Sequence, residues 1–231
     1  MVRRGILLIL AGVFWLAGVG AMYQQINLFS TAYANSQQKA ADIMNFQFPF
    51  SIPGTDLVAL ELRSYDGLYL EDGSKEGVSN VAALILRNDS TKLLEHAHVE
   101  LWQGTQKLNF EINYLPAGEK ILVIESDKSQ YVQSKISACS GYGTFASTDI
   151  AGLVSIRQIG EKMLLITNPG PLPLKRVVVY FKNFDYESSM FLGGIVYEIP
   201  IHSLAPGETY FAKPLYYSNE SSRIVKIKTS G

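Results

Sequence analysis

The sequence predicts an all-β protein in which two tandem β-sandwiches follow an N-terminal transmembrane or signal helix. Three observations support this prediction. From Asp56 onward, short alternating apolar runs are separated by Gly, Asp, Asn and Pro, and no long stretch has helical spacing. One pattern within this region occurs twice, 89 residues apart. Finally, an uncharged apolar run ends at residue 23.

The N-terminal apolar run extends from Gly5 to Tyr23 and follows two arginines, Arg3 and Arg4. It is about as long as a helix that crosses a membrane, and longer than the roughly 7 to 15 apolar residues of a cleavable signal. We therefore expect residues 1–23 to anchor the chain, single-pass, in a bacterial cell membrane. Because the arginines stay cytoplasmic, the rest of the chain is then extracytoplasmic. The small-x-small triplet Ala32–Ala34 leaves an alternative, secretion after cleavage near Ala34.

Composition restricts the possible partners. Hydrophobic residues make up 47% of the chain and charged residues 18%, which is typical of a folded protein rather than a disordered one. Beyond Ala34 the chain has 18 basic and 21 acidic residues, so nucleic acid is not an expected partner. The single cysteine, Cys139, rules out an internal disulfide and a multi-cysteine metal site. We interpret it as a small apolar residue at a strand end, with a reactive thiol or a dimer-forming disulfide as alternatives.

The repeated pattern reads "INYLPAGEKIL" at residues 112–122 and "IHSLAPGETYF" at 201–211. We expect Leu115 and Leu204 to close one end of each sandwich, and the Pro/Ala and Gly positions to make a turn. Glu119 and Glu208 would then begin the next strand in solvent. A binding role for these two glutamates is the alternative.

The match extends backwards along the chain. "AALILRNDSTKLLEHAHVELW" at 82–102 aligns with "KMLLITNPGPLPLKRVVVYFK" at 162–182, which places Asn88 over Asn168. In each copy an apolar strand ends at the asparagine, a polar or Pro-rich turn follows, and a second strand begins. Side chains of a strand alternate between its two faces. The pattern therefore predicts one core-facing set in each second strand: Ala97, Val99 and Leu101 in the first copy, and Val177, Val179 and Phe181 in the second.

This order of elements, a strand, "RN" or "TN", a turn, a strand, a hairpin, "LPAGE" or "LAPGE" and two further strands, resembles the bacterial immunoglobulin-like modules of cell-surface proteins, including the cell-adhesion-related CARDB domains. The resemblance covers most of residues 56–231. It implies that each sandwich is immunoglobulin-like, with seven strands, and that the role is extracellular and structural or adhesive. It implies no catalytic residues, and a fold alone does not define a function.

These observations predict five segments along the chain. Residues 1–23 are the anchor or signal segment, and 24–53 form a juxtamembrane stalk. Residues 54–138 form the first β-sandwich and 153–231 the second. The segment 139–152, "CSGYGTFASTDIAG", is rich in Gly and Ser and is expected to be the linker between them.

One metal-ligand pattern occurs, in "HAHVE". His96, His98 and Glu100 alternate along a strand and therefore project from one face, within reach of one ion. Since the intervening residues take the core face, an ordinary solvated sheet face is the favoured interpretation. Paired carboxylates occur only as scattered hairpin residues such as Glu71 and Asp72. The sequence therefore predicts no catalytic residues, no cofactor and no enzyme activity.

The second repeat contains nine extra residues around "KNFDYESSMFLGGIVY". A longer hairpin loop with aromatic, Met and polar side chains is typical of a protein contact. The candidate binding residues are Asp185, Tyr186, Glu187, Met190, Phe191 and Leu192. The alternative is a longer hairpin that covers the edge of its own sandwich.

The predicted function is that of a non-enzymatic, membrane-anchored extracytoplasmic protein that presents tandem modules for protein or cell-envelope contacts. A secreted or anchored carbohydrate- or metal-binding module is one alternative, with the His96 and His98 face or the aromatic loop as its site. A structural subunit of a surface or secretion assembly is another.

Overall fold

The computed structural model describes residues 46–146, with residue 75 excepted, and 154–230. These residues belong to one compact unit that contains 13 strands and no helix, so the all-β prediction is confirmed. The predicted anchor over residues 1–23 lies outside the described residues, as does most of the stalk. In the part of the chain that the structure describes, no helix is long and apolar enough to cross a membrane.

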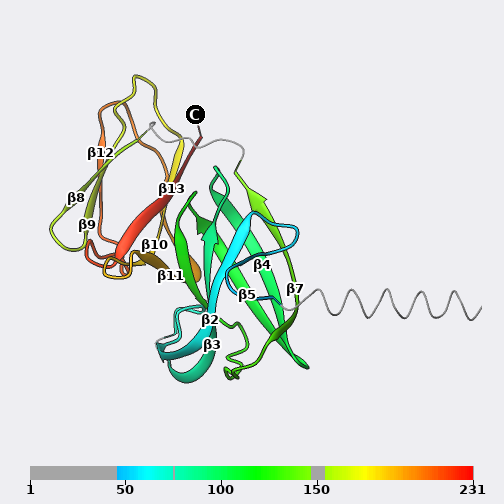
Figure 1. Ribbon diagram of the computed structural model, residues 1–231. Helices are drawn as coiled ribbons and strands as arrows, with labels where there is room; N and C mark the ends of the chain where they lie inside the picture. Colours follow the sequence, from blue (N-terminus) through cyan, green and yellow to red (C-terminus); the bar gives the residue numbers. More distant parts are fainter. Residues whose placement is uncertain (1–45, 75, 147–153, 231) are drawn as a thin grey trace, which may run out of the picture. The chain divides into compact units, whose positions relative to one another are not determined.

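The largest sheet has seven strands in the order β1-β2-β3-β6-β11-β10-β13 (Figure 1). Neighbouring strands run antiparallel except β6 and β11, which are parallel. The strands are β1 (Phe50–Ser51), β2 (Leu57–Leu68), β3 (Gly77–Asn88), β6 (Lys120–Ile124), β11 (Met190–Ile201), β10 (Arg176–Asp185) and β13 (Ser222–Ser230).

Two smaller sheets have three strands each, in the orders β5-β4-β7 and β12-β9-β8. The first contains β4 (Leu94–Gln103), β5 (Gln106–Leu115) and β7 (Ile136–Phe145). The second contains β8 (Ser155–Ile159), β9 (Met163–Thr167) and β12 (Thr209–Ala212). We call residues 46–146 the first lobe and residues 154–230 the second lobe.

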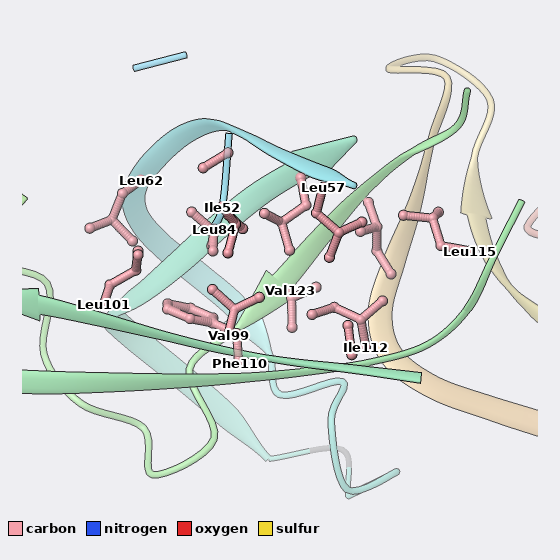
Figure 2. Close-up of a cluster of buried hydrophobic side chains, with 14 of the residues drawn as sticks. Ile52, Leu57, Leu62, Leu84, Val99, Leu101, Phe110, Ile112, Leu115 and Val123 are labelled. Atoms are coloured by element: carbon pink, nitrogen blue, oxygen red, sulfur yellow. The ribbon is translucent and has the colours of Figure 1, made fainter. Parts of the chain in front are cut away.

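The first hydrophobic core lies between the β5-β4-β7 sheet and strands β2, β3 and β6. Figure 2 shows Val99 and Leu101 of β4 and Phe110 and Ile112 of β5 together with Leu84 and Val123 from the large sheet. Ala97, Val99 and Leu101 are all fully buried, as the alternation in this strand predicts. The core is therefore sandwich-like, with apolar faces of two sheets packed together.

A second core lies between the β12-β9-β8 sheet and the β10 end of the large sheet. Val177, Val179 and Phe181 of β10 are buried in it, which confirms their predicted core face. From β9, Leu164 and Ile166 contribute to the same cluster. Each lobe thus has its own core, while the seven-stranded sheet extends through both.

The repeated sequence forms the same corner twice. In both copies the asparagine is buried, and its side-chain nitrogen donates to the leucine carbonyl, at 2.9 Å from Asn88 to Leu115 and 3.1 Å from Asn168 to Leu204. The same nitrogen also donates to the carbonyl four residues later. The turn glycine, Gly118 or Gly207, has a positive φ and donates its N–H to the asparagine carbonyl. The asparagine therefore ties the strand end to the leucine corner in each lobe.

We expect Asn88→Ala and Asn168→Ala each to lower the free energy of unfolding by about 2 kcal/mol, because each removes the buried amide that ties the strand end to the leucine carbonyl. The two losses should be similar, since the bonds are equivalent. Asn109→Ala is the matched control, because the side chain of Asn109 bonds only Asp127 on the surface. Urea unfolding of the three variants measures the effect, and a loss in the control as large as in the corner variants would contradict it.

The nine-residue insertion joins the two lobes. It extends the β10–β11 hairpin, so that Phe191 and Leu192 pair with Ile121 and Leu122 of β6. Phe191 then lies in the first core, while Leu192 packs against the cluster on the opposite face of the same sheet. The insertion therefore completes the first lobe instead of covering only the edge of its own lobe.

The lobe boundaries also differ from the predicted segments. Residues 139–145, expected at the start of a linker, belong to β7 and pair with β4. Their glycines reflect packing, since a Cβ at Gly141 would lie 2.9 Å from the Ile52 side chain. Residues 147–153 lie outside the described residues. At the other end, Phe46 forms a bridge with Ile136, so the last residues of the predicted stalk belong to the first lobe.

Candidate functional site at the junction of the two lobes

Two oppositely charged side chains lie where the lobes meet, Lys182 fully buried and Glu71 half-buried. Lys182 lies in β10, at an irregularity in the pairing with β11, and is fully buried. Glu71 lies in the connection between β2 and β3. Val177, Val179 and Phe181 face the second core, so alternation directs Lys182 to the opposite face of β10. That face brings a lysine of the second lobe toward a carboxylate of the first.

Each of the two side chains bonds to the backbone of the opposite lobe. The Lys182 ammonium donates to the Asn113 carbonyl of β5 at 2.6 Å and to the Gly194 carbonyl of β11 at 3.3 Å. The Glu71 carboxylate accepts from the Ile124 N–H at 2.8 Å and from the Gly194 N–H. Each charged side chain therefore forms a bond between the two lobes. Gly194 takes part in both, through its carbonyl with Lys182 and through its N–H with Glu71.

Burial dominates the electrostatics of this pair. It lowers the pKa of Lys182 from 10.5 to about 7, against the attraction of Glu71. It raises the pKa of Glu71 from 4.5 to about 7, against the two backbone N–H bonds and the charge of Lys182. Both charged forms are thus disfavoured by desolvation, although each side chain partly compensates the other.

A cavity of about 380 Å³ opens beside Glu71. Its polar lining consists of Tyr69, Glu71, Asp72, Glu111, Asn113 and Ser126. Glu111 also accepts from His98 on the outer face of the first lobe, at 2.6 Å. The cavity is therefore acidic, and one residue of its lining, Glu111, also contacts the histidine face.

Two titratable groups with pKa values near 7 are suited to proton transfer near neutral pH. In this site, however, both titratable groups are already hydrogen-bonded to the backbone. Both oxygens of Glu71 accept N–H bonds, and the Lys182 ammonium donates to two carbonyls without lining the cavity. The geometry thus favours a structural joint over an acid–base pair.

Sequence reasoning missed this joint, although one signal was present. Lys182 interrupts the apolar run of "RVVVYFKNF", and a charged residue within such a run must be paired or exposed at the end of a sheet. Glu71 gave no such signal, because "LYLEDGS" is typical of a solvated turn. Its burial depends on β11 of the other lobe, far away in the sequence.

The predicted metal-ligand residues lie together on the outer face of β4. The His98 ring bonds Glu111 at 2.6 Å and Glu100 at 3.2 Å through its two nitrogens. His96 bonds Asn113 at 3.1 Å, and Tyr142 stacks on His98 with ring centroids 5.6 Å apart. Within the described residues, no group of three or more His, Cys, Asp or Glu side chains is arranged to hold a metal ion. The ring nitrogens of His98 instead form charge-assisted bonds.

This arrangement predicts a pH dependence of stability. Burial lowers the pKa of His98, but its bonds to Glu111 and Glu100 outweigh burial and raise the pKa above 6.5. The stabilisation is therefore fully present below about pH 6.5 and is lost as the pH rises through the folded pKa. Relative to His98→Asn, the wild type should gain free energy of unfolding between about pH 8 and pH 6. Urea titrations at both pH values test this, and a constant difference would contradict it.

The predicted binding residues of the β10–β11 hairpin serve different purposes. Phe191 is fully buried, and Met190 and Leu192 pack on the first lobe, so these three do not form a displayed surface. Asp185 bonds the turn through the Glu187 N–H and the Ser188 hydroxyl. Of the six, Tyr186 is 52% exposed and Glu187 lies at the surface. The apolar character that indicated a partner reflects packing within the molecule.

Cys139 lies within β7 and packs against the first core. Burial raises the pKa of its thiol to about 12, so the thiol stays protonated at neutral pH. The side chain therefore behaves as a small apolar residue, although in the interior of a strand and not at its end.

A different apolar surface lies at the edge of the second lobe. Strand β12 pairs with β9 on one side only. The exposed large apolar side chains of this strand and the following loop are Tyr210, Phe211, Leu215 and Tyr216, with Phe211 66% and Leu215 81% exposed. We call these four residues the edge patch. Tyr210 and Phe211 lie on opposite faces of β12, so the patch surrounds the edge of the strand. Exposed apolar side chains gathered at an open strand edge are typical of interaction sites.

Comparison with known proteins gave no matching family model and no matching curated relative.

Proposed function

We propose that this chain is a non-enzymatic protein of a bacterial cell membrane, anchored by residues 1–23, that presents two tandem immunoglobulin-like modules outside the cytoplasm. Its task is to bind a protein partner, and the edge patch supplies the contact. Two features support the modular interpretation: each lobe has its own core, and each contains the same asparagine corner. The observation that carries the binding role is the exposure of the edge patch.

The open edge of β12 fits an extended segment of a partner protein. The Glu208 carbonyl accepts from the Asn168 N–H, so by alternation the backbone groups of Thr209 and Phe211 point away from β9. No charged residue lies between Glu208 and Lys213. By contrast β13, an edge strand of the large sheet, contains three cations that discourage pairing: Arg223, Lys226 and Lys228. The partner's strand would therefore add beside β12, with its side chains on the edge patch.

Site-specific photo-crosslinking of the full chain in cells tests this proposal. With a photoreactive residue at position 216, we expect one discrete adduct with a second protein, which Phe211→Lys abolishes. The matched control is the same residue at Val132, which is 53% exposed in the first lobe. Equal adducts at both positions, or none at position 216, would contradict the proposal. An adduct of the chain with itself would favour a structural subunit instead.

A further inference from the structure

A second pocket lies on the outer face of β10 and β13, opposite the second core. It has a volume of about 280 Å³. Its floor consists of Val178 and Tyr180, which are 4% and 6% exposed. Arg176 and Lys228 border it, and Thr229 and Ser230 complete the lining. The register places Arg176 opposite Ser230 and Val178 opposite Lys228, so neighbouring strands bring the two cations to one side of the sheet.

The lining contains two cations and no carboxylate. Farther along β13, Lys226 pairs with Glu95, and Arg223 pairs with Glu119 at 2.9 Å. Neither Arg176 nor Lys228 has such a partner among the residues that the structure describes. The cations near the junction therefore form ion pairs with the first lobe, whereas the two at the pocket form none within the described residues.

Aromatic groups hold the Lys228 ammonium in place. It donates to the Tyr114 hydroxyl at 3.1 Å, and it lies 5.5 Å from the centroid of the Tyr180 ring and 5.7 Å from that of Tyr114. The bond to Tyr114 also raises the pKa of Lys228, so the ammonium is charged at neutral pH. A fixed charge loses little conformational entropy when it binds an anion. Two acidic residues lie near this face: Glu198, opposite Tyr180 on β11, and Glu95, whose charge also acts on Lys228.

We infer that this pocket binds a phosphate group that carries a small polar substituent, such as a glycerol or sugar phosphate. A guanidinium fork suits bidentate contact with phosphate oxygens, and the ammonium supplies a second point charge. The hydroxyl of Ser230, opposite Arg176, can donate to the same group. The pocket offers more space than a bare phosphate fills, and Tyr180 forms an apolar floor for the substituent. This inference does not rest on the proposed function, because it uses neither β12 nor the edge patch.

Calorimetric titration of the full chain in a neutral detergent tests the inference, with glycerol 3-phosphate as the probe. We expect saturable binding that weakens about tenfold in Arg176→Gln and in Lys228→Gln. Lys92→Gln is the matched control, because Lys92 is an exposed cation elsewhere in the first lobe. Thermal unfolding of each variant checks that it is folded. No heat of binding, or an equal loss in the control, would overturn the inference.

A second experiment distinguishes the source of the phosphate group, a lipid headgroup or a free phosphate ester. Binding to phosphatidylglycerol vesicles is compared with binding to phosphatidylcholine vesicles and to free glycerol 3-phosphate. If the anionic vesicles bind more tightly than the free ester, and Lys228→Gln removes the difference, the ligand is a lipid headgroup. If the free ester binds as tightly as the vesicles, the ligand is a soluble or polymeric phosphate ester. Binding to anionic vesicles that is unchanged in Lys228→Gln would contradict the site.

Discussion

Replacing Lys182 by Met should lower the free energy of unfolding by about 3 kcal/mol, because it leaves the half-buried Glu71 without its counter-charge. The substitution also removes the ammonium that donates to the carbonyls of Asn113 and Gly194. Glu71→Gln alone should be destabilising for the reciprocal reason. The double variant should lose less than the sum of the single losses, by about 1 kcal/mol or more, since the two side chains act as one unit. Urea unfolding of the four proteins gives the coupling free energy, and strict additivity would contradict the paired role.

The directions of the two pKa shifts set the pH dependence of this effect. Lys182 has a folded pKa of about 7, below its ordinary value of 10.5, so its contribution to stability is fully present above pH 10.5 and is lost as the pH falls toward 7. Glu71 has a folded pKa of about 7, above 4.5, so its contribution is fully present below pH 4.5 and is lost as the pH rises toward 7. Relative to the double variant, the wild type should therefore be least stable near neutral pH.

Replacing Gly194 by Ala should have the second large effect, a loss of about 3 kcal/mol. A methyl group at this position would overlap the backbone carbonyl oxygen of Glu111, which cannot move without displacing β5. It would also lie 2.9 Å from the Glu71 carboxylate. The substitution thus separates the two lobes at the point where both buried charges bond.

Gly77→Ala is the matched control for this prediction. Gly77 begins β3, and an added Cβ there meets no atom within 4 Å. Its backbone does not have a positive φ either, so alanine introduces no strain. Thermal unfolding of both variants provides the comparison. If Gly194→Ala were as stable as Gly77→Ala, the close approach of β11 to β5 would be wrong.

Local periodicity is the part of this fold that the sequence makes predictable. Val99 and Val179 could be placed in cores because a strand with one buried face must alternate. The asparagine corner was predictable in outline because its spacing occurs twice. Neither inference needs information about the contacts between the two lobes.

The contacts that join the lobes are not predictable from the sequence, because they are not local. Parallel pairing of β6 with β11 and the bonds of Glu71 to Gly194 connect residues that are distant in the sequence. Periodicity cannot distinguish an apolar hairpin that packs inside the molecule from one that binds a partner, so it does not reveal that Phe191 is buried. Composition predicts a linker at Gly141, because it does not reveal that a strand needs glycine there to pack against Ile52.

The central claim is that the first 23 residues anchor two modules that lie outside the cytoplasm. Intact-mass measurement of the protein with a C-terminal tag, recovered separately from membranes and medium, tests it most directly. External protease added to intact cells before recovery reports the side on which the tag lies. We predict a species beginning at Met1 in the membrane fraction, with a tag that the protease removes. A species that begins near Asn35 in the medium, or a membrane species with a protected tag, would contradict the claim.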